Sequence, residues 1–368
     1  MLFLTRWFGV TGSEAERNLA MEPAVIGEIV ERILLMQTNV AARQHCPLAR
    51  GTHAKGICAR AQFEVLDVTA GRDRALAARL AKGIYAKPGV YPAIVRFANS
   101  DPQVNSDFKG DVRALSFYIE LPPDGANPAR QDYSMQSAST LPLNDAVAFR
   151  AVMNVLTAPS PARGVWSLTF RDKLRFLRSM LLVQSQLRRP IRPYQQLRYW
   201  SDVPFRHGPI DVVKYCATPS LDNPARALPK DNANSLQDEL VRHLNEDARM
   251  SRFDFALQFL DTESMTYWGK RRDASFWIEN ASIEWSEKQA PFHTVARLTL
   301  MPKSQIAAEA SEAVYFDVTG NSTPDSVPLG SINRARWPAE VASRKARMRI
   351  DNRSEPYTSR REIAAGDA

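Results

Sequence analysis

The chain of 368 residues lacks features that several classes of protein require. Its three cysteines, Cys46, Cys58 and Cys216, are an odd number at wide spacing, and this does not indicate a disulfide framework. Apolar runs are short: the run at 180–183 is far below the length that spans a bilayer. The start of the chain, 1–17, is apolar only briefly and has no A-x-A-like cleavage site, so no signal peptide is expected. These absences predict a cytoplasmic protein in a reducing compartment, with no transmembrane segment.

The chain also lacks internal repeats and low-complexity runs. Hydrophobic residues make up 44% of it and charged residues 24%, which is ordinary for a soluble globular protein. The net charge is +8, and arginines cluster at 334–353 and 359–363 without a recognised nucleic-acid-binding module. One interpretation is a solvated helix face followed by a basic tail. The other is a basic surface over 334–361 for nucleic acid or anionic membrane. No specific nucleic-acid partner is predicted.

Strand-like segments dominate the chain after residue 53. They are short, rich in β-branched and aromatic residues, and separated by Gly, Pro, Asn or Asp. These segments lie at 63–68, 91–98, 112–121, 132–139, 210–218, 253–260 and 293–301. Helical spacing is found instead at 22–43, 72–85, 143–190, 235–250 and 331–349. Because few crossover helices separate the strands, we expect an antiparallel sheet or barrel in one α+β domain decorated with helices.

The chain has only five histidines, and one of them, His53, follows an arginine at a spacing of three residues. The stretch RGTHAKG places His53 three residues after Arg50 and just before a predicted strand. A zinc site would join His53 to His45, Cys46 and Cys58. The adjacent His-Cys pair fits common zinc-finger spacing badly, and no C-x-x-C pair accompanies it. A histidine at a strand start is commonly a structural residue, so His53 by itself does not decide between a structural and a catalytic role.

Several segments taken together resemble the catalase superfamily, in its minimal branch. The segments are RGTHAKG, YPAIVRFANSD, GDVRALSFYIE and YWSDVPFRHGPIDVVKY, with a looser match at QDYSMQSASTLPLNDAVAF. Their order and spacing agree with that family over about 48–350. The resemblance implies an α+β fold with an antiparallel β-barrel core of catalase type and N-terminal, inserted and C-terminal helices. We therefore expect a helical segment over 1–44, the barrel core with its helices over 45–350, and a basic flexible tail over 351–368.

The resemblance also implies a haem b site and a peroxide or organic hydroperoxide as substrate. His53 matches the distal base, which moves a proton between the two peroxide oxygens. Arg50 and Arg96 match arginines that pair with the haem propionates, and a planar guanidinium suits a carboxylate. Gln136 takes the position of an asparagine that helps to hold the peroxide, with the same amide on a longer arm. A homo-oligomer is compatible with this resemblance.

The C-terminal segment departs from the family. Catalases ligate the haem iron through a tyrosinate on a C-terminal helix. Arg336 and Arg347 match the arginines four residues before and seven after that tyrosine, but Glu340 stands between them in its place. Three alternatives stay open: Glu340 ligates the iron, another residue does, or the haem has been lost.

Weak axial donation makes fast hydrogen peroxide dismutation the least expected activity of the family. The function that the resemblance implies is that of a haem protein acting on peroxides, as a peroxidase or an organic-hydroperoxide enzyme. The alternative is a haem-free catalase-fold protein with a binding or scaffold role.

Overall fold

A computed structural model describes residues 16–17, 20–45, 50–122, 129–223 and 226–351 of the chain. Cys46 of the rejected zinc set and nearly all of the predicted basic tail lie outside these residues. Within them, no helix is long and apolar enough to cross a membrane.

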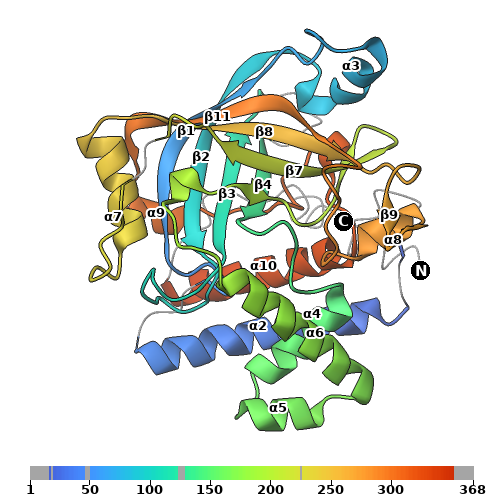
Figure 1. The fold of residues 1–368 in the computed structure, drawn as a ribbon. Helices are drawn as coiled ribbons and strands as arrows, with labels where there is room; N and C mark the ends of the chain where they lie inside the picture. The colour runs from blue at the N-terminus through green and yellow to red at the C-terminus, as the bar shows by residue number, and fades with distance from the viewer. Residues whose placement is uncertain (1–15, 18–19, 46–49, 123–128, 224–225, 352–368) are drawn as a thin grey trace.

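Eight strands close into an antiparallel barrel, as the sequence predicts (Figure 1). The strands are β1 (Gly56–Val65), β2 (Gly89–Asn99), β3 (Arg113–Glu120), β4 (Arg130–Gln136), β5 (Tyr199–Trp200), β7 (Asp211–Pro219), β8 (Ser251–Phe259) and β11 (Phe292–Gln305). They follow the order β5-β4-β3-β2-β1-β11-β8-β7, and pairing of β5 with β7 closes the ring. The short β6 (Phe205–His207) pairs with β7, and β9 (Thr266–Tyr267) and β10 (Lys270–Arg271) form a separate hairpin.

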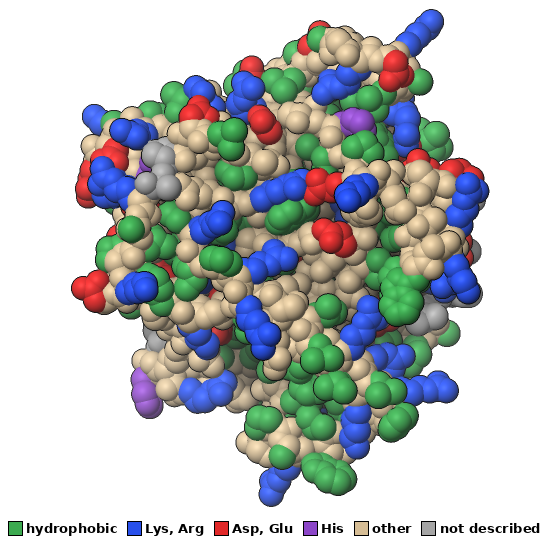
Figure 2. Space-filling model, viewed as in Figure 1, with side chains coloured by type: hydrophobic (Ala, Val, Ile, Leu, Met, Phe, Trp, Pro, Cys, Tyr) green, Lys and Arg blue, Asp and Glu red, His purple; other side chains and the backbone are tan. Residues whose placement is uncertain are grey.

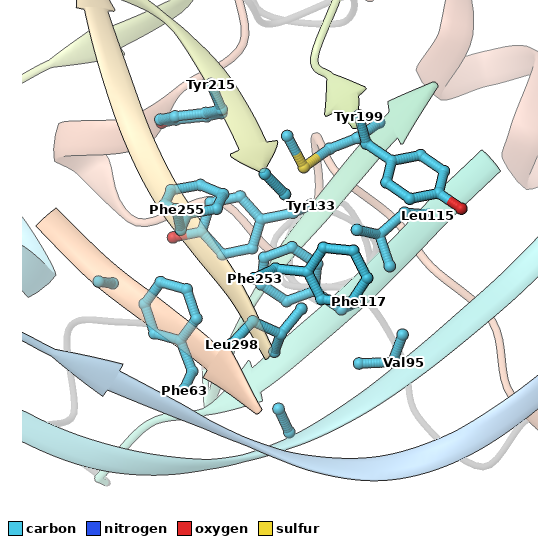
Figure 3. Packing of buried hydrophobic residues seen from close by; sticks show 14 of the residues in the cluster. Phe63, Val95, Leu115, Phe117, Tyr133, Tyr199, Tyr215, Phe253, Phe255 and Leu298 are labelled. Carbon is cyan, nitrogen blue, oxygen red and sulfur yellow. The ribbon is translucent and has the colours of Figure 1, made fainter. Parts of the chain in front are cut away.

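The interior of the barrel is filled with aromatic and aliphatic side chains (Figure 3). The rings of Phe117 and Tyr133 stack with their centroids 4.6 Å apart, and Phe255 meets Tyr133 edge-on at 5.3 Å. Because side chains alternate along a strand, Phe97 points inward and its neighbour Arg96 points to the outer face of the wall. Since side chains occupy the interior, a ligand must bind outside the wall.

Helices surround this barrel, and one group of them packs together on one side of it (Figure 1). They are α2 (Glu22–Gln44), α3 (Arg74–Leu80), α4 (Ala146–Leu156), α5 (Pro161–Ser167), α6 (Phe170–Leu187), α7 (Ser235–Val241), α8 (Ala274–Glu279), α9 (Ala308–Ala313) and α10 (Ser331–Asp351). The helical region predicted over 143–190 is three helices, because capping by Asp145, Ser160 and Thr169 begins a new helix each time. The helix predicted over 72–85 ends at Leu80, ahead of the positive φ of Gly83.

The C-terminal helix α10 lies between the barrel and α2 (Figure 1). Arg334 of this helix is 2% exposed and forms ion pairs with three carboxylates. Its guanidinium lies 2.6 Å from Glu16, 2.8 Å from Glu22 and 3.2 Å from Glu279. This cluster joins α10 to α2 and α8, and so fixes which face of α10 turns toward the barrel.

Candidate functional site

A cavity of about 460 Å³ lies between the outer face of the barrel wall and the helices beneath it. That volume is in the usual range for a small-molecule site. The structure brings all seven residues selected from the sequence into its lining: Arg50, His53, Arg96, Gln136, Arg336, Glu340 and Arg347. Their proximity is therefore a finding, while the role of each residue stays a prediction.

Strand register positions the wall side of the cavity. Arg96 pairs with Ser116 across β2 and β3, and Ser116 pairs with Ser134 across β3 and β4, so these three side chains form a row on the outer face. Gln136 ends β4 on the same face. All four line the cavity.

Helix periodicity positions the opposite side. Arg336, Glu340, Ser343 and Arg347 recur every three or four residues along α10 and share one face. The helix predicted over 331–349 is confirmed by α10 at Ser331–Asp351. The spacing of Arg336, Glu340 and Arg347, taken from the sequence, thus reflects a real helix face.

His53 lies in the loop just before β1, with a left-handed backbone at φ 59°. Its N–H donates to the Ser100 carbonyl at 3.2 Å, and its Nδ1 lies 2.9 Å from Thr52 Oγ1. The buried Nε2 atom has no hydrogen-bond partner among the described residues. Burial, reinforced by Arg96, Arg336 and Arg50, lowers the pKa of the imidazole to about 3. The ring is therefore neutral at physiological pH.

Arg96 supports the loop that carries His53. Its Nη2 donates to the His53 carbonyl at 2.9 Å and approaches the Ala54 carbonyl at 3.4 Å. Gly56 makes room for this contact, because a Cβ there would lie 2.5 Å from the Arg96 guanidinium carbon. The Nε of Arg96 is buried without a partner in the described part of the chain.

Arg50 and Arg347 bind the end of α9, in the connection between β11 and α10. Arg50 Nη2 donates to the Val314 carbonyl at 2.6 Å, and Arg347 Nη1 donates to the Glu312 carbonyl at 3.0 Å. Burial and the nearby charges of Arg96 and Arg347 lower the pKa of Arg50 well below its usual value. Part of each guanidinium is therefore already engaged by backbone, and the cations of the site repel one another.

Glu340 is the acidic residue on the cavity-facing side of α10. Its Oε1 accepts from Arg336 Nε at 3.1 Å. The side chain keeps 34% of its surface and lines the cavity. Burial raises the pKa of the carboxyl, and Arg336 opposes that rise. The arrangement offers an oxygen donor that a neighbouring cation already holds.

Three further lining residues have no role in the sequence-based prediction. Asp202 is 2% exposed with φ 59°, and its Oδ1 has no partner among the described residues. Its strained backbone leaves no signal in the sequence. Arg344 shares the α10 face with Glu340, and the helical period would have identified it. Its guanidinium lies 4.4 Å over the ring of Tyr315, a tyrosine that also lines the cavity.

The rest of the lining is largely apolar and comes from helices and loops. It includes Ile33, Leu141, Leu143, Phe149, Val183 and Leu187. A cavity that combines arginines from the barrel wall and α10 with aliphatic side chains suits a ligand that is both anionic and apolar.

Solved structures of catalases resemble this chain. A fungal catalase superposes with a TM-score of 0.61 at 13% identity, over 87% of this chain and 62% of its own. A bacterial catalase superposes with a TM-score of 0.54 at 15% sequence identity, over 86% of this chain and 60% of its own. Catalase A from Saccharomyces cerevisiae superposes with a TM-score of 0.57 at 13% sequence identity, over 85% of this chain and 63% of its own. The chain thus corresponds to about three-fifths of the length of each of these catalases. No protein-family model and no curated protein matches the sequence. The chain has the catalase fold, as the resemblance of its motifs predicts.

Proposed function

We propose that the chain binds haem in this cavity and acts on peroxides, as a peroxidase or an organic-hydroperoxide enzyme rather than as a fast catalase. One observation carries the proposal. Five arginines line a partly apolar cavity, and beside them lies a neutral imidazole whose buried Nε2 has no partner in the described residues.

The charge of the cavity fits the propionates of haem. Arg50, Arg96, Arg336, Arg344 and Arg347 outnumber the acidic residues of the lining, which are Asp111, Asp202 and Glu340. Burial, reinforced by this surplus of positive charge, lowers the pKa values of Arg50 and His53. An anionic ligand would relieve this repulsion, and guanidinium groups are suited to carboxylates. The buried Nε atoms of Arg50 and Arg96 have hydrogen-bonding capacity that backbone carbonyls do not use.

Bound haem would supply an iron that gives electrons to the peroxide and recovers them from the electron donor. The part of this chain is to move the proton. The neutral His53 Nε2 takes the proton from one peroxide oxygen and returns it to the departing one. Gln136 lines the same cavity and offers an amide that can both donate to and accept from the peroxide.

Glu340 is the oxygen donor that α10 would offer to the iron. Arg336 Nε donates to this carboxylate at 3.1 Å and withdraws charge from it, so Glu340 would donate to iron more weakly than a tyrosinate. Weaker donation disfavours rapid hydrogen peroxide dismutation. The aliphatic lining favours peroxides that carry an apolar group.

A peroxidase assay on the hemin-loaded protein tests this function. We expect cumene hydroperoxide to be consumed with a higher kcat/KM than hydrogen peroxide. Replacing the base in His53→Ala is expected to lower kcat by about 10²–10⁴-fold, the usual contribution of a positioned acid-base group. His293→Ala is the matched control, because His293 does not line the cavity. Equal rates for His53→Ala and the unchanged protein would refute the role of His53.

A second function is favoured by the contacts of Arg50 and Arg347. Both already bind the backbone of 312–314, and Arg336 already pairs with Glu340. These contacts suit a haem-free protein whose cavity takes another apolar anion. Failure to take up hemin, together with saturable binding of a fatty acid, would favour this alternative.

A further inference from the structure

The helices α5 and α6 present an apolar surface to the outside of the molecule. Trp166, Phe170, Leu174, Leu177 and Leu181 expose 80, 75, 53, 57 and 61% of their surface. From Phe170 onward they are spaced by four, three and four residues, so they form one stripe along α6. Figure 2 shows hydrophobic side chains gathered at this end of the molecule, with Lys and Arg side chains around them. We call these five residues the α5–α6 stripe.

Buried polar side chains on the opposite face of α6 fix the outward orientation of the stripe. The fully buried residues of α6, Asp172, Ser179 and Gln186, are polar, whereas an ordinary amphipathic helix buries mainly apolar residues. Asp172 accepts from Arg175 at 2.8 Å and from Arg150 at 3.3 Å, while Gln186 donates to the Thr140 carbonyl at 2.8 Å. The apolar face is therefore fixed by the fold in an outward orientation.

Positive charge is concentrated around the stripe. Residues 161–192 contain eight Lys and Arg against one Asp, a net charge of +7, while the whole chain carries +8. Arg163 and Arg171 are exposed, and the Lys173 ammonium lies 5.3 Å over the ring of Trp166. Trp, Phe and Leu on one face with Lys and Arg beside them is the composition of helices that lie in a membrane interface.

We propose that the α5–α6 stripe docks the protein on the surface of an anionic lipid bilayer, with the apolar side chains among the acyl chains and the basic residues at the headgroups. A second copy of the chain is a poorer occupant. A symmetric dimer would pair the surface with itself and bring two charges of +7 together. An anionic lipid surface supplies both the apolar contact and the opposite charge.

The same helix connects this surface to the cavity. Val183, Gln186 and Leu187 of α6 line the cavity, all within two turns of Leu181. Docking would therefore bring the cavity close to the acyl chains of the bilayer. That consequence rests on the proposed function, whereas the docking itself does not require haem.

Vesicle co-sedimentation of the full chain without hemin tests the docking. We expect binding to phosphatidylcholine vesicles that contain about 30% phosphatidylglycerol, and much weaker binding to phosphatidylcholine alone. Binding should weaken as the salt rises from about 0.1 M to about 1 M, where the screening length falls from about 10 Å to about 3 Å. Leu174→Ser with Leu177→Ser should weaken binding by at least about tenfold, through the loss of apolar contact.

Matched controls separate the stripe from general surface effects. Ile210→Ser with Leu221→Ser removes two apolar residues outside the stripe that are even more exposed, and should leave binding unchanged. Arg163→Gln with Arg171→Gln should weaken binding roughly fivefold for each charge, while Arg74→Gln with Lys87→Gln should weaken it less. Absence of vesicle binding at low salt, or an equal loss in the stripe and control variants, would overturn the proposal. So would a stable dimer in sedimentation analysis that the leucine substitutions dissociate.

Discussion

At the residue scale, His53 is held neutral by its surroundings. Burial and three arginines lower the pKa of its imidazole to about 3, while the Arg96 and Thr52 contacts orient it. The sequence could identify His53 and Arg50 because both lie in one short motif. It could not reveal Asp202, because a buried aspartate with φ 59° looks like any other aspartate in a sequence.

The lowered pKa of His53 predicts a pH dependence of stability. Between pH 6.5 and about 3 the unfolded chain binds a proton at this residue and the folded chain does not, so stability falls as the pH falls. From about pH 7 to about pH 5, the unchanged protein should lose about 1–2 kcal/mol more unfolding free energy than His53→Gln. Urea unfolding of both proteins at the two pH values measures the difference. Identical losses would show that His53 is not held neutral.

Gly56 predicts a steric effect that can be measured. In Gly56→Ala the new Cβ would lie 2.6 Å from the Phe97 carbonyl oxygen, which is backbone and cannot move aside. We expect a loss of about 1–3 kcal/mol in unfolding free energy, with displacement of Arg96 from the His53 loop. Gly27→Ala is the control, since nothing lies within 4 Å of its Cβ in α2. That variant should gain about 0.5–1 kcal/mol, and a similar loss in both would contradict the steric account.

At the element scale, α10 serves two purposes on different faces. One face brings Arg336, Glu340 and Arg347 to the cavity. Outside that face, Arg334 links the helix to its neighbours through ion pairs with three carboxylates. The cavity face was predictable, because spacings of four and seven residues are helical spacings. The outward stripe of α6 was not, because its apolar periodicity indicates a core-facing helix and only the contacts of Asp172 and Gln186 reverse it.

Removing the Arg334 guanidinium should loosen α10. Arg334→Met leaves the carboxylates of Glu16, Glu22 and Glu279 close together without their shared cation, and we expect a loss of about 3–5 kcal/mol in unfolding free energy. Arg297→Met is the matched control, because its ion pairs are exposed and each contributes at most about 1 kcal/mol. Thermal unfolding of both variants distinguishes the two cases. A loss no larger than in the control would mean that Arg334 does not fasten the helix.

At the scale of the whole molecule, the packed barrel interior decides where function can lie. Side chains such as Phe117, Tyr133 and Phe255 fill the centre, so the cavity forms between the outer wall and α10. The barrel was predictable from strands separated by turn residues. Its closure was not, because β5 consists of two residues, Tyr199–Trp200, and pairs with both β4 and β7. Such a short strand has no periodicity to detect.

The absorption spectrum of the purified chain during titration with hemin tests the central claim most directly. The account predicts uptake of a single hemin with a Soret band, and a changed band in Glu340→Ala and Glu340→Tyr if Glu340 is the ligand. Glu309→Ala, an exposed change on α9, should leave the spectrum as it is. A chain that takes up no hemin would contradict the account, and its cavity would then belong to a different anionic ligand.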